Sequence, residues 1–176
     1  MEPRRPLPFD PIATARDHWI TNGWTDAAPG MAAVTSVMRA HQLMLAKVEK
    51  ALRPFGLTFA RYEVLMLLSF TRHGEIPMAR ASSRLQVHPT SITNAVDRLE
   101  QAGLVRREQH PDDRRTTLIR ITDDGRSIAR SATDAVNEQV FAALPLGKDD
   151  IEQLVAVLTR FRATAGDFTG PERTTD

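Results

Sequence analysis

The sequence predicts a mainly α-helical protein with one small β-hairpin. Apolar residues recur at spacings of three and four along most of the chain, which is typical of amphipathic helices. Only residues 104–121 combine two β-rich stretches with a polar, proline-containing connection. With 176 residues, 41% of them hydrophobic, the chain is long enough to bury a core in one domain with additional helices.

Two helices are expected in the first third of the chain. Asp10 and Pro11 form a cap and first-turn pair that starts a short helix over residues 10–22. A long helix follows over residues 31–53, because its apolar residues keep helical spacing until a Pro-Phe-Gly sequence stops it.

Two shorter helices and a minimal strand are expected next. Thr58 is placed to cap a helix over residues 59–71, whose Leu-Met-Leu-Leu run indicates a core position. Ile76 is expected in a minimal strand beside the hairpin, and Pro77 opens a short helix over residues 78–85. This short helix is the first half of a predicted helix-turn-helix.

The second helix of this pair starts at His88 and Pro89, since proline suits the first helical position, and Gly103 ends it as a left-handed cap. Its apolar residues fall on one stripe: Ile92, Ala95, Val96 and Leu99. Its other face carries mostly short hydrogen-bonding side chains: Thr90, Ser91, Thr93, Asn94, Asp97 and Arg98. Such a face either approaches a surface closely and reads donors and acceptors there, or is simply the solvated side of a surface helix.

The hairpin follows directly. An extended segment from Leu104 is expected to pair with a β-rich segment over residues 116–121, and the connection EQHPDDRR is too polar for a core. The tip of this connection carries Arg114 and Arg115, and the combination with the preceding helices is a winged helix-turn-helix.

Charge gives only local support for a nucleic-acid partner. The net charge of the chain is +1, whereas residues 98–120 hold six arginines against four carboxylates. Among these arginines, Arg106 and Arg107 either contact phosphates or only edge the sheet.

Two further helices end the sequence. Thr122 is placed to cap the first, with two aspartates in its first turn where carboxylates favour the helix dipole, and this helix is expected to reach about residue 144. The last helix is expected over residues 149–164, and residues 166–176 are expected to be frayed.

The chain is expected to divide into three parts. Residues 1–56 form an N-terminal arm and helices, 57–121 the winged helix-turn-helix, and 122–176 the C-terminal helices. The middle part can bury its own faces, but the apolar stripes of the terminal helices need a cover. These helices either fold back within one chain or pack against a second copy.

The order and spacing of these residues resemble the MarR family of bacterial transcriptional regulators, over roughly residues 57–126. The wing signature of that family, Asp-x-Arg followed by Leu-Thr, is met by Asp113 and Arg115, with Ile121 in place of the leucine. The other matching positions are Leu85, Val87, Ile92, Thr93, Val96, Leu99, Gly103, Leu104, Val105, Arg107, Thr122 and Gly125.

The resemblance implies a homodimer in which the terminal helices of two copies interlock and two winged helices bind palindromic double-stranded DNA. It also implies repression of transcription and release from DNA by a small anionic or phenolic ligand. Base-edge or phosphate contacts would come from the helix residues Thr90, Ser91, Thr93, Asn94 and Arg98.

The resemblance assigns the wing a second kind of contact. Asp113 would orient Arg115 into the minor groove, with Arg114 beside it. The alternative is that both arginines are solvated charges at the tip of a hairpin.

A ligand site is expected in the cleft between the long helix, around Arg39 and His41, and the N-terminal helix that bears Trp19. An arginine there can pair with a carboxylate or phenolate, and a tryptophan can cover its ring. The alternatives are that Arg39 is solvated and that Trp19 fills an interface.

The residues argue against an enzyme, a cofactor and a metal site. The chain has no cysteine, which excludes thiolate nucleophiles and cysteine-based redox sensing. Its five histidines show no close-spaced ligand pair, no serine lies in a nucleophile-elbow pattern, and no glycine-rich phosphate loop is present.

A cytoplasmic protein without a membrane partner is expected. No stretch approaches the ~18 consecutive apolar residues of a membrane-spanning helix, and the N-terminal arginines lack the apolar run of a secretory signal. The rival interpretation is a winged helix that binds a protein partner instead of DNA. The wing favours DNA, because a protein-binding version has no use for paired arginines beside an orienting aspartate.

Overall fold

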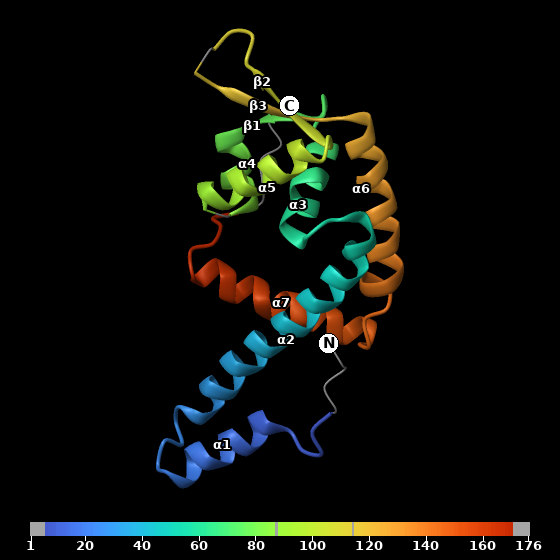
Figure 1. The fold of residues 1–176 in the computed structure, drawn as a ribbon. Coiled ribbons are helices and arrows are strands. Elements are labelled where there is room, and N and C mark those ends of the chain that lie inside the picture. Colours follow the sequence, from blue (N-terminus) through green and yellow to red (C-terminus); the bar gives the residue numbers. More distant parts are fainter. Residues whose placement is uncertain (1–5, 87, 114, 171–176) are drawn as a thin grey trace.

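The computed structural model describes residues 6–86, 88–113 and 115–170 (Figure 1). It confirms the predicted fold class: the protein is mostly helical, with one small antiparallel sheet. The elements follow in the order α1 (Pro11–Thr21), α2 (Ala28–Leu52), η1 (Arg53–Phe55), α3 (Phe59–Ser69), β1 (Glu75–Pro77), α4 (Met78–Leu85), α5 (Pro89–Gln101), β2 (Val105–Gln109), β3 (Thr117–Ile121), α6 (Asp123–Val136), η2 (Asn137–Phe141) and α7 (Lys148–Thr164).

The helix starts follow from their caps. The Asp10 carboxylate accepts the Ile12 amide at 2.9 Å, and Thr58 and Thr122 cap α3 and α6 in the same way, as expected from the sequence. Two boundaries differ most from expectation. The long helix begins three residues earlier, at Ala28, and the helix after Thr122 passes into a single π-helical turn at 137–141 instead of continuing to residue 144.

The sheet joins the minimal strand to the hairpin. The strand order is β1-β3-β2, all antiparallel, with Ile76 opposite Ile119 and Val105 opposite Ile121. Arg120 of the central strand pairs with Glu75 of β1 and, at 2.9 Å, with Glu108 of β2. One side chain therefore ties all three strands together.

The core lies between α2, α3, α5, α6 and the sheet. Its largest fully buried side chains include Leu52, Leu65, Leu99 and Ile119, and Val136 of α6 belongs to the same cluster. The core thus crosses both boundaries expected at residues 56 and 121.

The root of the hairpin is fixed against α6. The Thr122 hydroxyl donates to the Gly103 carbonyl at 2.8 Å and accepts the Gly125 amide at 3.0 Å. Gly125 packs so closely that a β-carbon on it would lie 2.0 Å from the Leu104 carbonyl oxygen. This close approach requires glycine, and it orients the hairpin relative to α6.

The terminal helices leave apolar surface uncovered. Figure 1 shows α1 and the first half of α2 extending away from the lobe that contains α3, α4, α5 and the sheet, and α7 crosses α2 in this view. None of the residues of α7 is buried, and Val155 and Phe161 are 58% and 69% exposed. On α2, Val34 and Met38 are exposed to a similar extent.

The segment after α7 differs from expectation. Residues 166–170, expected to be frayed, form a turn in which Asp167 and Phe168 are half-buried. Within the described ranges, none of the helices combines the length and apolar character that crossing a membrane requires.

Candidate nucleic-acid interface

The helix α5 is held so that one face stays outside. Its apolar stripe, including Ile92 and Val96, is buried against α3 and α4, and Pro89 occupies the first helical position as predicted. The preceding His88 caps the helix, because its imidazole Nδ1 accepts the Thr90 amide at 3.2 Å. The predicted left-handed Gly103 ends the helix region with a φ of 72°.

The five side chains predicted to contact DNA from this helix are all exposed. Thr93 donates its hydroxyl hydrogen to the Pro89 carbonyl at 3.0 Å, which leaves the oxygen free to accept. Ser91 and Asn94 make no side-chain hydrogen bond to other described residues. Arg98 reaches only Gln101, at 3.3 Å, so most of its donors face outward.

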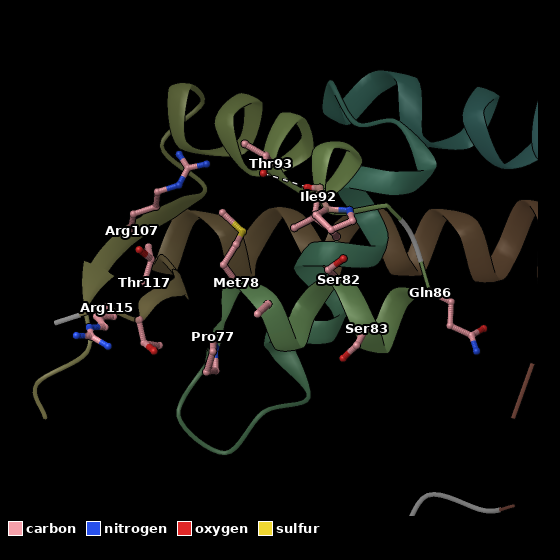
Figure 2. Close-up of a pocket in the computed structure, with 13 residues that line it drawn as sticks. Pro77, Met78, Ser82, Ser83, Gln86, Ile92, Thr93, Arg107, Arg115 and Thr117 are labelled. Atoms are coloured by element: carbon pink, nitrogen blue, oxygen red, sulfur yellow. Dashed lines mark hydrogen bonds between the residues drawn. The ribbon is translucent and has the colours of Figure 1, made fainter. Parts of the chain in front are cut away.

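A groove runs between this helix, α4 and the wing (Figure 2). It has a volume of about 800 Å³, and its walls include Ser83 of α4, Thr93 of α5 and Arg115 of the wing. Figure 2 shows Arg107 and Arg115 at the wing side of this groove and Gln86 at its opposite end. Arginine donors and hydroxyl groups therefore line one continuous concave surface.

Arg107 joins the wing to α5. Its guanidinium lies 2.5 Å from carboxylate oxygens of both Asp97 and Glu100, and its backbone amide donates to Glu100 at 2.9 Å. Burial lowers the pKa of Arg107, but the hydrogen bonds and charges of the two carboxylates outweigh it and raise the pKa above its ordinary value. Of the two roles left open for Arg107 from the sequence, the structure supports a structural one at the edge of the sheet.

The side chain of Asp113 organises the tip of the wing. Its carboxylate accepts the Thr116 hydroxyl at 2.7 Å and the Arg115 amide at 3.0 Å. These two hydrogen bonds lower the pKa of Asp113 below its ordinary value. The carboxylate that was expected to orient Arg115 thus holds its main-chain amide, and Arg114 lies outside the described residues.

The remaining wing arginines have carboxylate partners. Arg106 pairs with Glu108 at 2.5 Å, and the same glutamate reaches Arg120. Within the described part of this face, Arg98 and Arg115 have no carboxylate partner, so their charge is available to a ligand.

The three residues expected to bind a ligand do not share one cavity. Arg39 lines a cavity of about 800 Å³ with Leu7, Phe9 and Met38, but Trp19 and His41 are not among its lining residues. Trp19 instead packs edge-on against Trp24, with ring centroids 5.3 Å apart.

An apolar cavity that the sequence did not reveal lies between α3 and α6. It has a volume of about 520 Å³ and is lined by Tyr62, Met66, Phe70 and Phe141, among others. Glu63 also lines it, and burial raises the pKa of Glu63. Among the described residues, no group of three or more histidine, aspartate or glutamate side chains could hold a metal ion.

Sequence reasoning missed two further features of this interface. The first is the pair of ion pairs that Arg107 makes with Asp97 and Glu100 of α5. These two carboxylates are three residues apart, so they lie on the same face of the helix, and this spacing indicates a cation beside that face. Gln86, whose amide contacts the chain after α7, had no local signal because its partner lies 81 residues away.

Comparisons with known proteins agree on one family. Residues 57–117 match the profile of the MarR family. The chain is 44% identical to Sco5413, a MarR family transcriptional regulator from Streptomyces coelicolor, and the two structures superpose with a TM-score of 0.74. This similarity covers 81% of the present chain and 99% of the other.

Two further similarities are weaker. Sco3205 from Streptomyces coelicolor, a MarR family regulator solved in complex with DNA, is 26% identical with a TM-score of 0.64, covering 82% of this chain and 91% of that one. The transcriptional repressor MdtR of Bacillus subtilis (strain 168) is 34% identical over 82 residues, which are 47% of this chain and 49% of that protein. The chain matches about half the length of such curated relatives.

Proposed function

The chain belongs to the MarR family of transcriptional regulators, and from this premise we propose that it binds a palindromic DNA site as a homodimer and represses transcription there. The family is one of regulators and not of enzymes. One observation carries the proposal. Thr93 of α5 and the wing residue Arg115 line one groove, and the nearby carboxylates of Asp97 and Glu100 are already paired with Arg107.

The exposed face of α5 and the wing suit different parts of DNA. Short side chains such as Ser91 and Asn94 can approach base edges in the major groove, where donors and acceptors differ between base pairs. The wing arginine Arg115 suits the backbone or the narrow minor groove beside it. Arg107 and its two carboxylates then set the distance between helix and wing, so both contacts are made at once.

The uncovered helices support the homodimer. The apolar face of α7 includes Leu154, Val155 and Phe161, all exposed in a single protomer. Packing these residues against a second copy would bury them and relate two α5 helices by a two-fold axis. Two such helices fit half-sites one turn of DNA apart, which makes a palindrome the expected target.

Repression is proposed because a dimer seated across a promoter blocks polymerase without further contacts. The similarity to the repressor MdtR supports this sign of regulation. A promoter–reporter fusion with and without the protein tests it, and higher expression in the presence of the protein would contradict repression.

Replacing individual interface residues should separate the two kinds of DNA contact. Arg115→Ala should weaken binding to all sequences. It should also make the slope of the logarithm of the binding constant against the logarithm of the salt concentration shallower by about one. Ser91→Ala or Asn94→Ala should instead reduce the preference for the operator over other DNA, by ~1–3 kcal/mol where a bidentate base contact is lost. Fluorescence anisotropy with operator and scrambled duplexes at several salt concentrations measures both effects.

The exposed Lys148 on α7 provides a control, and Lys148→Ala should leave both quantities unchanged. If Arg115→Ala and Asn94→Ala lower the affinity for every duplex equally, α5 does not read the sequence and its assignment is wrong.

A small anionic effector is a second part of the proposal, supported by the Arg39 cavity and its apolar walls. Salicylate should weaken operator binding by about 5- to 150-fold, the usual range of allosteric coupling, and Arg39→Ala should abolish this effect. Operator titrations with and without salicylate measure the coupling, and Lys47→Ala on the same helix is the control. Binding that is indifferent to a panel of aromatic carboxylates and phenols would remove the effector from the proposal.

A further inference from the structure

The chain after α7 forms a hydrogen-bonded turn. Gly166 adopts a left-handed φ of 78°, and its amide donates to the Ala163 carbonyl at 3.1 Å. The Asp167 amide donates to the Arg162 carbonyl at 3.0 Å. These two hydrogen bonds form a Schellman motif, which ends the helix and satisfies its last carbonyl groups.

Side chains strengthen this turn. In many Schellman motifs an apolar contact joins the third-last helical residue to the second residue after the C-cap. Arg162 and Asp167 occupy these two positions here. In this protein an ion pair takes its place, with Arg162 Nε 2.5 Å from Asp167 Oδ2. The Arg162 guanidinium also lies over the Phe168 ring, 5.4 Å from its centroid. The Asp167 carbonyl oxygen is therefore held in a fixed direction.

That carbonyl accepts a hydrogen bond from the helix-turn-helix. Gln86, the residue that ends α4, donates its side-chain amide to the Asp167 oxygen at 2.7 Å. Gln86 has a φ of 53°, and it is the one non-glycine residue in the described ranges with a positive φ. The left-handed region is unfavourable for a residue with a β-carbon, so glycine would suit this turn better. Glutamine supplies the amide that glycine lacks.

We propose that residues 165–168, here termed the C-terminal strap, position the turn between α4 and α5. The strap thereby fixes α5, the helix proposed to read the DNA sequence and called the reading helix below, relative to α7. Figure 1 shows the chain after α7 leading up to α4, away from the main body of the terminal helices. Gln86 also lies at the end of the groove opposite Arg115, so the strap acts on the surface proposed to bind DNA.

The strap matters for binding because a dimer must place two reading helices at once. A winged-helix lobe that can change its orientation loses conformational entropy when both half-sites are occupied. This loss of entropy makes the free energy of binding less favourable. A strap that restricts the orientation beforehand removes part of that loss. This inference rests on the proposed DNA-binding function.

Two variants release the strap from opposite ends. Gln86→Gly removes the donor and relieves the backbone strain, whereas Arg162→Met removes the ion pair that orients Asp167. Each should lower operator affinity by about three- to tenfold, the effect of losing roughly one hydrogen bond. The double variant should be no weaker than either single one, because both remove the same interaction. Arg160→Met, on the same helix and without an ion pair among the described residues, is the matched control.

Thermal unfolding separates a positioning role from a structural one. Gln86→Gly should unfold at the same temperature as the parent protein or higher, since the strained turn becomes relaxed, and yet bind DNA more weakly. If only Gln86→Gly loses affinity and Arg162→Met does not, Gln86 contacts DNA directly and the strap is rejected. Unchanged affinity in both variants also rejects it.

A measurement without DNA distinguishes failure of the strap from failure of the proposed function. Because the chain lacks cysteine, Ala79→Cys and Thr169→Cys can carry spin labels on α4 and just beyond the strap with no background. One narrow distance distribution that broadens with Arg162→Met supports the strap. A broad distribution in the parent pair overturns it, while a narrow one in a protein that binds no DNA overturns only the DNA-binding function.

Discussion

Replacing Gly125 by alanine is expected to lower the free energy of unfolding by about 3 kcal/mol, at the upper end for overpacked positions. The added β-carbon would lie 2.0 Å from the Leu104 carbonyl oxygen and 2.9 Å from Ile121 Cγ1. Backbone must move to make room, and the same carbonyl accepts the Thr122 amide at 3.1 Å, so the α6 cap is disturbed as well. The melting temperature should fall by about 6–12 °C for a chain of this size, as measured by calorimetry or circular dichroism.

Gly30→Ala is the matched control. Gly30 lies within α2, and a β-carbon there would meet no atom within 4 Å. Alanine should therefore raise stability slightly, by about 0.5–1 kcal/mol, because it favours the helix. Equal stability of Gly125→Ala and the parent protein would mean that the hairpin root and α6 are not packed as described.

Phe161→Asp should convert the dimer into monomers. The side chain is 69% exposed in one protomer, so the substitution should leave the protomer folded. In the proposed dimer each Phe161 contributes about 1.5–3 kcal/mol by burial, and two-fold symmetry doubles the loss to about 3–6 kcal/mol. The dimer dissociation constant should rise by about 10²- to 10⁴-fold, measured by sedimentation equilibrium, with loss of tight binding to the full palindrome.

Gln153→Asp introduces the same charge on the polar side of the same helix and should leave the dimer intact. A parent protein that sediments as a monomer at micromolar concentration would contradict both the dimer and the palindrome. Identical dissociation constants for Phe161→Asp and Gln153→Asp would show that Phe161 does not lie in the dimer interface.

Local signals made most of the winged helix predictable. Proline at the first position of α5 removes an amide that would lack a partner in the helix. Gly103 as a left-handed end, and Thr58 and Thr122 as caps, satisfy backbone groups within a few residues. Such interactions depend only on neighbours in sequence, so their positions could be read directly. The DNA-contact assignments of the exposed α5 side chains remain predictions, although the structure places all of them on one accessible face.

Interactions between distant residues could not be read in this way. Arg107 looked like any other wing arginine until the fold brought it against Asp97 and Glu100. The expected fraying after residue 165 was wrong for residues 166–170, because Asp167 is held by Arg162 and Gln86. The composition of residues 166–176 is typical of a frayed terminus, and it gives no indication that Arg162 and Gln86 contact Asp167.

The position of Asp113 shows a third limit. The Asp-x-Arg signature indicated a link between the carboxylate and Arg115, and the carboxylate accepts the Arg115 amide. It did not specify which atoms meet, since a carboxylate two residues before an arginine can accept either its amide or its guanidinium. Only the turn geometry of the loop decides between them.

The bridge made by Arg120 has a consequence for how the protein folds. Glu75 and Glu108, its two partners, enclose α4 and α5 in the chain, so one central arginine closes a loop that contains the whole reading element. The entropic cost of closing this loop is offset only when β1 and β2 are both paired with β3, because Arg120 then contacts both glutamates. Helix α5, the wing and β1 should then open and close as a single cooperative unit, with amide protons that exchange together. We therefore expect partly folded forms of α5 to be rare and the winged helix to meet DNA fully formed.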